Sequence, residues 1–164
     1  MTSWDEIVRV HGPPTYQVAW RILGHAQDCE DVLQDVFIEA HQLYLGGKVT
    51  HWRTFLNRLV TFRALDSVRR RKDVRALGEL HIRDTAPGPD DVAMRRDDEA
   101  HLRSVVAALP PRQAAVFCLA HFEGLSHQEI SGTLDISTNA VAMALHKARV
   151  SLRATLLEEH KEQM

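Results

Sequence analysis

Apolar residues recur at helical spacing through nearly the whole of this sequence, and that periodicity limits the folds open to the chain. No run of alternating β-branched and aromatic residues is long enough for a convincing strand. Helix-breaking residues divide the periodic segments, notably at Gly12-Pro13-Pro14, Gly24, Gly46-Gly47 and Gly124. The sequence therefore predicts an all-α protein.

The helical segments form two groups on either side of a stretch that lacks apolar anchors. Helices are expected at residues 6–10, 16–23, 28–44 and 50–72, and again from residue 101 onward. Residues 73–100 carry eight acidic and four basic side chains, and residues 86–91 are rich in proline, glycine and aspartate. We therefore expect two small helical domains, residues 1–72 and 101–164, joined by a flexible linker at residues 73–100.

The overall composition is that of an ordinary globular protein without a membrane span. The net charge is −2, which argues against a protein that coats DNA non-specifically through uncompensated cations. The N-terminus lacks the basic and apolar segments of a secretory signal, so a cytoplasmic location with no membrane insertion is expected. Cys29 and Cys118 lie in apolar helical patterns, which favours two reduced, buried thiols.

Residues 126–153 carry the pattern of a helix-turn-helix. Ser126 and Glu129 have capping-box spacing, Asp135 stands where a left-handed residue would end the helix, and Ile136 can pack back into the core. Ser137 is placed to cap the next helix. Apolar residues then follow on one predicted stripe: Val141, Leu145, Ala148, Leu152 and Leu156. This arrangement favours a DNA-binding motif over a plain helical hairpin.

The open face of this second helix supplies the candidate contacts to a major groove. We expect Asn139 to read an adenine edge, and Ala142 and Met143 to contact a thymine methyl group. The other exposed residues near its start are Thr138 and His146. The cations Lys147, Arg149 and Arg153 are expected to meet phosphate.

The helix expected at residues 28–44 has an unusual outer face. Its apolar arc is predicted to be core: Val32, Leu33, Val36, Phe37, Ala40, Leu43 and Tyr44. The opposite arc holds Asp31, Gln34, Asp35 and Gln42, with Ile38 in their middle. A partner protein would explain that isoleucine, although single exposed aliphatic residues are also common.

The helix expected at residues 50–72 is basic. Residues 52–72 carry seven basic side chains and one acidic one. One apolar arc is predicted, formed by Trp52, Phe55, Leu56, Leu59 and Phe62. Beyond Phe62 the apolar pattern ends, and Asp66 and Arg70 have the spacing of an ion pair along the helix. The helix dipole also favours cations at a C-terminus, but the number of cations and their interleaved aromatics favour contact with nucleic acid.

Together these segments resemble the extracytoplasmic-function sigma factors, small initiation factors with two helical domains called regions 2 and 4. Residues 28–37 read D-x-E-D-x-x-Q-D-x-F, like the family's polymerase-docking stretch. Leu109-Pro110-Pro111-Arg112-Gln113, residues 122–130 and Leu134-Asp135-Ile136-Ser137 are similar to region 4. The resemblance covers most of the chain and implies an alternative sigma factor that directs core RNA polymerase to specific promoters and helps to melt them.

The resemblance also implies partners and site residues, and no cofactor or metal. Core polymerase would bind through its clamp helices at Asp31, Gln34, Asp35 and Ile38, and its flap would be a further contact. The minus-10 promoter element would meet Arg58, Phe62, Arg63, Arg69, Arg70, Arg71 and Lys72, and the loop at residues 45–51 would capture a flipped base. The minus-35 element would meet Thr138, Asn139, Ala142, Met143, His146, Lys147 and Arg149. The resemblance also allows an anti-sigma protein as a further partner.

Four positions depart from the family pattern. Glycine is usual where Asp135 stands, asparagine where Phe62 stands, and lysine or arginine where Ala142 and Ala144 stand. Two missing cations would weaken phosphate binding, by about one counterion each in the salt dependence. Tethering to polymerase can offset weak DNA affinity, because it raises the effective concentration of the second site.

Two other functions compete with initiation. A sigma-like decoy that sequesters an anti-sigma protein would explain Phe62, Ala142 and Ala144, but it would leave the basic run without a purpose. An enzyme is suggested by the ten histidines. However, no H-E-x-x-H spacing, glycine-rich phosphate loop or G-x-S-x-G elbow is present, so we expect no catalytic activity.

Overall fold

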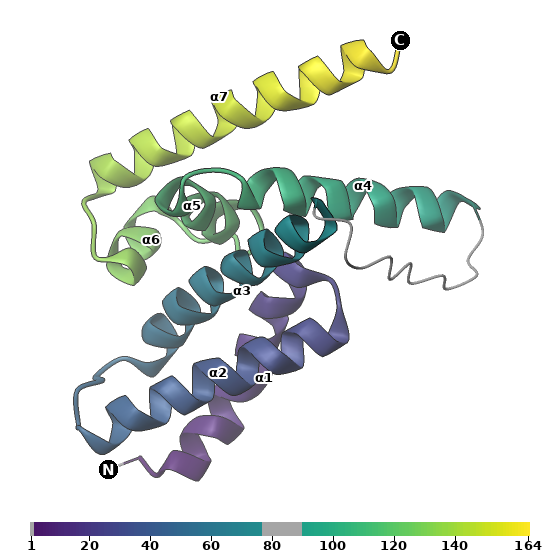
Figure 1. Ribbon diagram of the computed structural model, residues 1–164. Coiled ribbons are helices and arrows are strands. Elements are labelled where there is room, and N and C mark those ends of the chain that lie inside the picture. The colour runs from purple at the N-terminus through teal and green to yellow at the C-terminus, as the bar shows by residue number, and fades with distance from the viewer. Residues whose placement is uncertain (1, 77–89) are drawn as a thin grey trace.

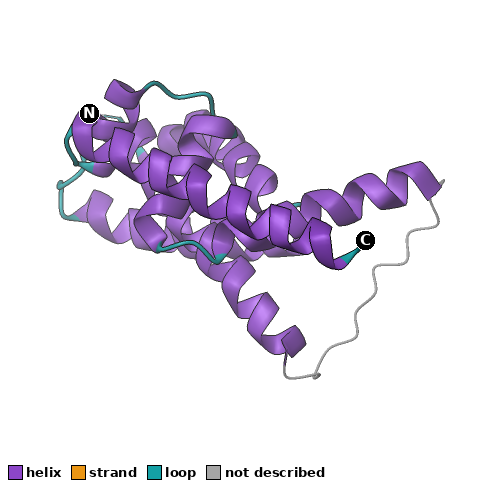
Figure 2. Cartoon of the chain, turned by 90° about the horizontal axis from the view of Figure 1, so that it is seen from above, coloured by secondary structure: helices purple, strands orange, loops and turns teal. Residues whose placement is uncertain are grey.

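The structure, a computed structural model, describes residues 2–76 and 90–164, with the side chains of residues 2–74 and 97–164. These residues form seven helices and no strand, which confirms the all-α prediction (Figure 2). The helices are α1 (Trp4–Leu23), α2 (Ala26–Leu45), α3 (Trp52–Ala76), α4 (Asp90–Ala107), α5 (Pro111–His121), α6 (His127–Leu134) and α7 (Thr138–Glu162). Helices α1 and α2 lie at the bottom of Figure 1, α3 crosses its middle, and α7 lies along the top.

Helix α1 runs through Gly12-Pro13-Pro14, where the sequence predicted an interruption. Proline cannot donate the helical hydrogen bond and costs about 3 kcal/mol in a helix interior. Both prolines are exposed, whereas Ile7 before them and Ile22 after them are almost completely buried. The helix therefore continues because burial of its apolar face on both sides of the prolines outweighs the local preference.

The buried face of α3 differs from the predicted arc. Of that arc only Leu56 is fully buried, while Trp52, Phe55, Leu59 and Phe62 are half-buried at its edge. The fully buried residues of α3 are Leu56, Val60, Thr61, Ala64 and Leu65. This face does not fade after Phe62, because α3 packs on α1 and α2 with one side and on α4, α5 and α6 with the other.

The helices around the predicted linker are longer than the sequence suggested. Helix α3 continues to Ala76 and α4 begins at Asp90, rather than ending at Lys72 and starting at His101. The proline- and glycine-containing part of the predicted linker, residues 86–89, lies outside the described residues. Helix α5 begins as expected, with Pro111 at the first helical position, where the missing amide costs no hydrogen bond.

The two helical halves pack against each other. One hydrophobic cluster runs from α1 to α7 and includes Ile22, Val60, Val106, Leu119 and Leu145. In Figure 1, α5 and α6 lie between α3 and α7. The predicted halves are therefore present, but α3 belongs to the core of both.

Candidate polymerase and nucleic-acid interfaces

Helices α6 and α7 form the helix-turn-helix that the sequence predicted, with both helix starts capped. The Ser126 Oγ accepts a hydrogen bond from the Glu129 amide at 3.1 Å, and the Ser137 Oγ accepts one from the Ala140 amide at 3.0 Å. Each bond satisfies one of the free amides at a helix N-terminus. Ser126 and Glu129 thus form one half of a capping box.

The turn between α6 and α7 depends on Asp135. This residue has φ 54° and ψ 50°, the left-handed conformation predicted for it, and its amide donates to the Ser131 carbonyl. The Ile136 amide donates to the same carbonyl at 3.2 Å, and the Ile136 side chain packs back against the core. The Ser131 hydroxyl in turn donates to the Ile136 carbonyl. These bonds fix the angle at which α7 leaves the turn.

Helix α7 exposes most of the residues proposed to meet the minus-35 element. Thr138, Asn139 and His146 are exposed, Met143 is 52% exposed, and Ala142 is half-buried. The opposite face is buried through Val141, Leu145, Ala148 and Leu152. The helix thus presents a largely polar, exposed face opposite a buried one, the arrangement that a recognition helix requires.

Two residues of α7 differ from their predicted environment. Leu156 was placed on the buried stripe but is 39% exposed, because α7 extends past the helices that cover its first half (Figure 1). The family pattern predicts a phosphate contact at Ala144, yet this residue is only 6% exposed. A cation at residue 144 would be driven into the core, so only Ala142 marks a lost contact on the open surface.

The cations of α7 are not equivalent. Lys147, Arg149 and Arg153 are all exposed, but only the Arg149 guanidinium also donates to Nε2 of His121 on α5, at 3.2 Å and 3.3 Å. Partial burial, and then the positive charge of Arg149, lower the pKa of His121. A neutral imidazole accepts this bond, so Arg149 is held in place against α5.

Of the seven residues on α3 that are proposed to contact the minus-10 element, some are exposed and others are bonded to residues of the protein itself. Arg58, Arg70 and Lys72 are exposed, and Phe62 is half-buried. Arg63 bonds to Glu39 on α2, which raises the pKa of Arg63.

The other two arginines of that set are engaged near the C-terminus of α3. Arg71 forms a 2.6 Å ion pair with Asp28 on α2. Arg69 forms a 3.1 Å ion pair with Asp66 and donates to the main-chain carbonyls of Ala107, the last residue of α4, and of Leu109. The predicted Asp66–Arg70 pair is therefore wrong, since Asp66 bonds to Arg69 one position earlier.

The outer face of α2 carries the predicted polymerase contacts. Asp31, Gln34 and Asp35 are exposed, and Ile38 is 54% exposed, as the sequence indicated. A carboxylate-flanked aliphatic residue of this exposure resembles the centre of an interface, which is apolar with a polar rim.

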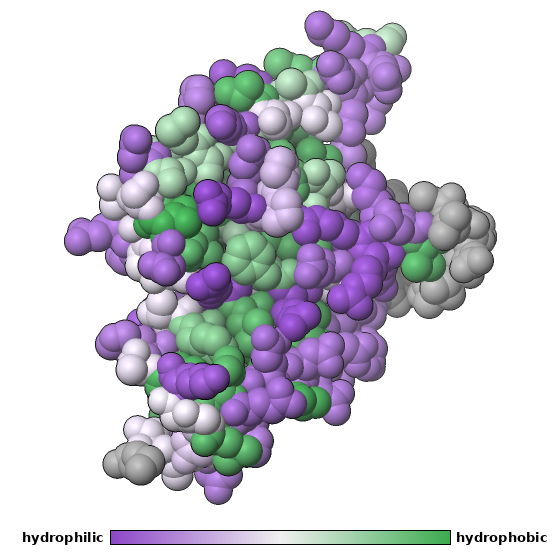
Figure 3. Space-filling model, turned by 60° about the vertical axis from the view of Figure 1, so that its left-hand side comes forward, coloured by the Kyte–Doolittle hydropathy of each residue, from purple (hydrophilic) through white to green (hydrophobic). Residues whose placement is uncertain are grey.

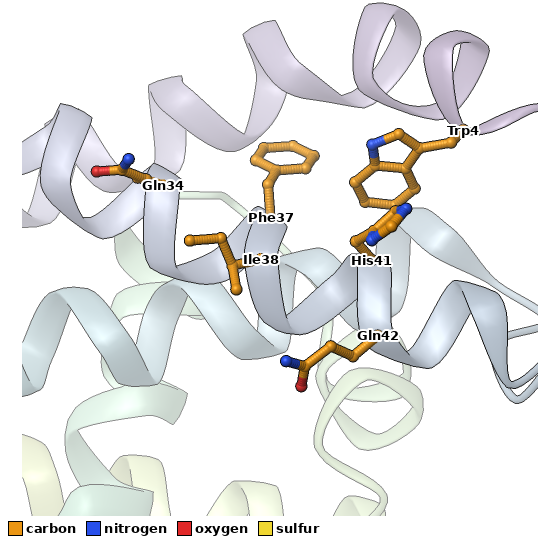
Figure 4. Close-up of a pocket in the computed structure, with 6 residues that line it drawn as sticks. All are labelled: Trp4, Gln34, Phe37, Ile38, His41 and Gln42. Atoms are coloured by element: carbon orange, nitrogen blue, oxygen red, sulfur yellow. The ribbon is translucent and has the colours of Figure 1, made fainter.

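An open hollow of about 460 Å³ lies beside Ile38 (Figure 4). Its walls come from α2 and from the start of α1, and Figure 4 shows Trp4 and His41 facing each other at one end. The lining residues are Trp4, Gln34, Phe37, Ile38, His41 and Gln42. Helical periodicity does not indicate Trp4 and His41 as part of this face, because only the pairing of α1 with α2 brings the two residues together.

An aromatic cluster supports the predicted base-capturing loop between α2 and α3. Trp4 contacts Tyr44 and Trp52 with ring centroids 5.5 Å and 6.0 Å apart, and Trp52 meets Phe55 edge to face. Leu45, the first residue of the predicted loop, is the last residue of α2 and is 71% exposed. The loop is therefore flanked by members of the aromatic cluster, Tyr44 before it and Trp52 after it, and most of its side chains are exposed.

The side of the molecule turned forward in Figure 3 carries apolar surface between hydrophilic side chains on both halves. Across the described residues, no group of histidine, cysteine, aspartate and glutamate side chains could hold a metal ion. No helix in the same residues is long and apolar enough to cross a membrane.

Comparisons with known proteins agree with this arrangement. The family model for sigma-70 region 2 matches residues 7–74, and the model for sigma-70 region 4 matches residues 100–152. The ECF RNA polymerase sigma factor SigE of Mycolicibacterium smegmatis is 36% identical over 169 residues, which cover 99% of this chain and 65% of SigE. The ECF RNA polymerase sigma factor SigW of Bacillus subtilis is 26% identical over 94% of this chain and 89% of SigW.

One solved structure shares the fold over nearly the whole chain. It is CnrH in complex with the cytosolic domain of CnrY, with a TM-score of 0.60, 25% identity, and coverage of 93% of this chain and 86% of that one. CnrH is an RNA polymerase sigma factor of Cupriavidus metallidurans. With both regions matched in order, this chain belongs to the sigma-70 family, in its extracytoplasmic-function group.

Proposed function

We propose that this chain is an alternative sigma factor that binds core RNA polymerase in the cytoplasm and directs it to specific promoters, without catalytic activity of its own. The observation that carries the proposal is the helix-turn-helix, whose α7 presents Thr138, Asn139, Met143 and His146 to solvent while its other face is buried. The proposed domains are residues 1–72 and residues 101–164.

The α2 face is the proposed docking site for the polymerase clamp helices. Asp31, Gln34 and Asp35 offer charge and hydrogen bonds, and Ile38 offers an apolar anchor beside the open hollow that Trp4 helps to line. Region 4 would meet the polymerase flap. Because the relative CnrH has been solved with the cytosolic domain of CnrY, an anti-sigma protein is a further proposed partner.

Substitution of Ile38 tests the docking site. Ile38→Glu buries a charge in the proposed interface, so it should weaken binding of core polymerase at least about tenfold. Val10→Glu is the matched control, because Val10 is also an exposed aliphatic residue, 48% exposed on α1. Promoter-dependent transcripts and core binding are the two measurements, and equal effects of the two variants would refute the assigned face.

Charge reversal of exposed cations on α3 distinguishes an initiation factor from a decoy. Reversing Arg69 or Arg71 would break internal ion pairs, so the informative change is Arg58, Arg70 and Lys72 to glutamate. Transcription should be abolished while core polymerase still binds, because phosphate contacts are lost and the fold is kept. The same reversal at the exposed cations Arg9 and Lys161 is the control. Unchanged transcription would remove these residues from the minus-10 site.

A further inference from the structure

His121, the last residue of α5, lies against Arg149 of α7. The Arg149 guanidinium donates to Nε2 of His121 through its Nε at 3.3 Å and through a terminal nitrogen at 3.2 Å. Both residues are exposed, so a ligand in solution can reach the pair. A guanidinium has five N–H donors, and three of them are not used by these two bonds.

The imidazole of His121 rests on an aromatic ring of its own helix. The ring centroids of His121 and Phe117 are 4.3 Å apart, and Phe117 packs against the hydrophobic core. Phe122 in turn meets Phe117 edge to face, with the centroids 6.1 Å apart. The imidazole is therefore supported by α5 as well as by Arg149.

Arg149 lies on the side of α7 that carries proposed minus-35 contacts. It follows Ala142 by seven residues and His146 by three, so these three positions lie along one side of the helix. The first residues of a recognition helix read base edges, while basic side chains around them meet the phosphates. A duplex read by the start of α7 would therefore bring backbone phosphate close to Arg149 and to His121 beside it.

The charge of His121 is finely balanced. Partial burial, and then the positive charge of Arg149, lower its pKa, so the ring is mainly neutral at pH 7. The negative end of the α5 dipole favours the charged ring, because His121 lies in the last turn of that helix. The nearby carboxylate of Glu123 is paired with Arg21. A phosphate bound beside the ring would add a negative charge and stabilise the imidazolium.

We propose that His121 and Arg149 form a phosphate-binding site across α5 and α7, in which one DNA phosphate accepts hydrogen bonds from both side chains and His121 takes up a proton from solvent. The inference rests on the proposed function, which supplies the DNA. Binding exchanges the Arg149–His121 bond for two charge-assisted bonds, which are stronger than neutral ones. His121 would thus supply from α5 a cation on the side of α7 where Ala142 replaces the lysine or arginine of the family pattern.

The pH dependence of DNA binding tests the site in the full-length chain. The measurement is the anisotropy of a fluorescent 30-base-pair duplex of random sequence at low salt, since phosphate contacts do not depend on sequence. In His121→Gln, the side-chain oxygen can still accept from Arg149 but cannot become charged. Between pH 7.5 and 5.5 the affinity of the parent chain should rise at least about threefold more than that of His121→Gln, because proton uptake is linked to binding. At pH 5.5 the salt slope of the parent should be steeper by about one.

Two further variants separate phosphate binding from a structural role. His160→Gln is the matched control, because His160 is exposed near the other end of α7, and it should keep the rise in affinity at low pH. His121→Lys places a fixed cation at the site, so it should bind the duplex more tightly than the parent at pH 7.5. A purely structural role for His121 predicts weaker binding in both His121→Gln and His121→Lys.

NMR titration of the His121 ring gives a direct measurement of its charge. The pKa of His121 should rise when the duplex is added, and it should also rise in free Arg149→Gln, which lacks the opposing charge. An unchanged pKa with the duplex bound would overturn the site, and so would equal pH dependence of binding in the parent and His121→Gln. A parent chain that binds no duplex even at low salt would instead contradict the proposed function, and this inference with it.

Discussion

Asp135 shows how one residue can hold a turn at some cost to stability. A non-glycine residue in the left-handed region is strained by its Cβ, although aspartate tolerates it better than most. Asp135→Gly should therefore stabilise the chain by up to about 1 kcal/mol, as measured by urea unfolding. Asp135→Asn, which tolerates the same φ, should stay near the parent value. A loss of stability in the glycine variant would show that the carboxylate itself contributes.

His121 makes stability depend on pH in a defined direction. The pKa of its imidazole is lowered in the folded chain, first by burial and then by Arg149. Below about pH 6.5 the unfolded chain therefore binds more protons than the folded one, and stability is lost as the pH falls. Unfolding midpoints between pH 7.5 and 5 should drop less in His121→Gln. The pKa of His11 is also lowered, by burial and by Arg53, so part of the dependence of stability on pH should remain in His121→Gln.

Helix α7 has two alanines within one turn, of which Ala142 is half-buried at the surface and Ala144 is buried in the core. Ala142→Lys places a cation beside the proposed groove-reading face, so duplex binding should tighten and its salt slope should steepen by about one. Ala144→Lys drives the ammonium group into the core and should destabilise the chain by at least about 2 kcal/mol.

Anisotropy of a labelled duplex and urea unfolding, applied to both variants, check this pair. Ala142→Lys should leave stability within about 0.5 kcal/mol of the parent. If Ala144→Lys is as stable as Ala142→Lys, the assigned rotation of α7 about its axis is wrong.

The whole molecule has one shared core, so it should unfold as one unit. All three tryptophans, Trp4, Trp20 and Trp52, lie in the N-terminal half, and their fluorescence reports on that half alone. Circular dichroism reports on every helix. The two urea transitions should therefore coincide, because coincident probes mark a two-state transition. A dichroism transition that begins before the fluorescence change would show that the halves unfold separately.

Much of the local architecture could be predicted because it depends on neighbours in sequence. Ser126, Asp135 and Ser137 act through bonds to residues within four positions, and Ile38 lies opposite the apolar arc of its own helix. Such features follow from helical periodicity and capping alone. They were sufficient for the fold class, the helix-turn-helix and the exposed α2 face.

What the tertiary structure decided depends on residues far apart in the chain. Packing carries α1 through Pro13 and Pro14, buries Ala144, and joins Trp4 to α2. Acceptors on other elements determine that Arg63, Arg69 and Arg71 are engaged while Arg58, Arg70 and Lys72 are free. The sequence by itself determined where α5, α6 and α7 begin, because a proline at the first helical position and a capping serine act locally. Which of their charges remain open to a partner was decided only when the helices packed, because burial and long-range pairing belong to the folded chain.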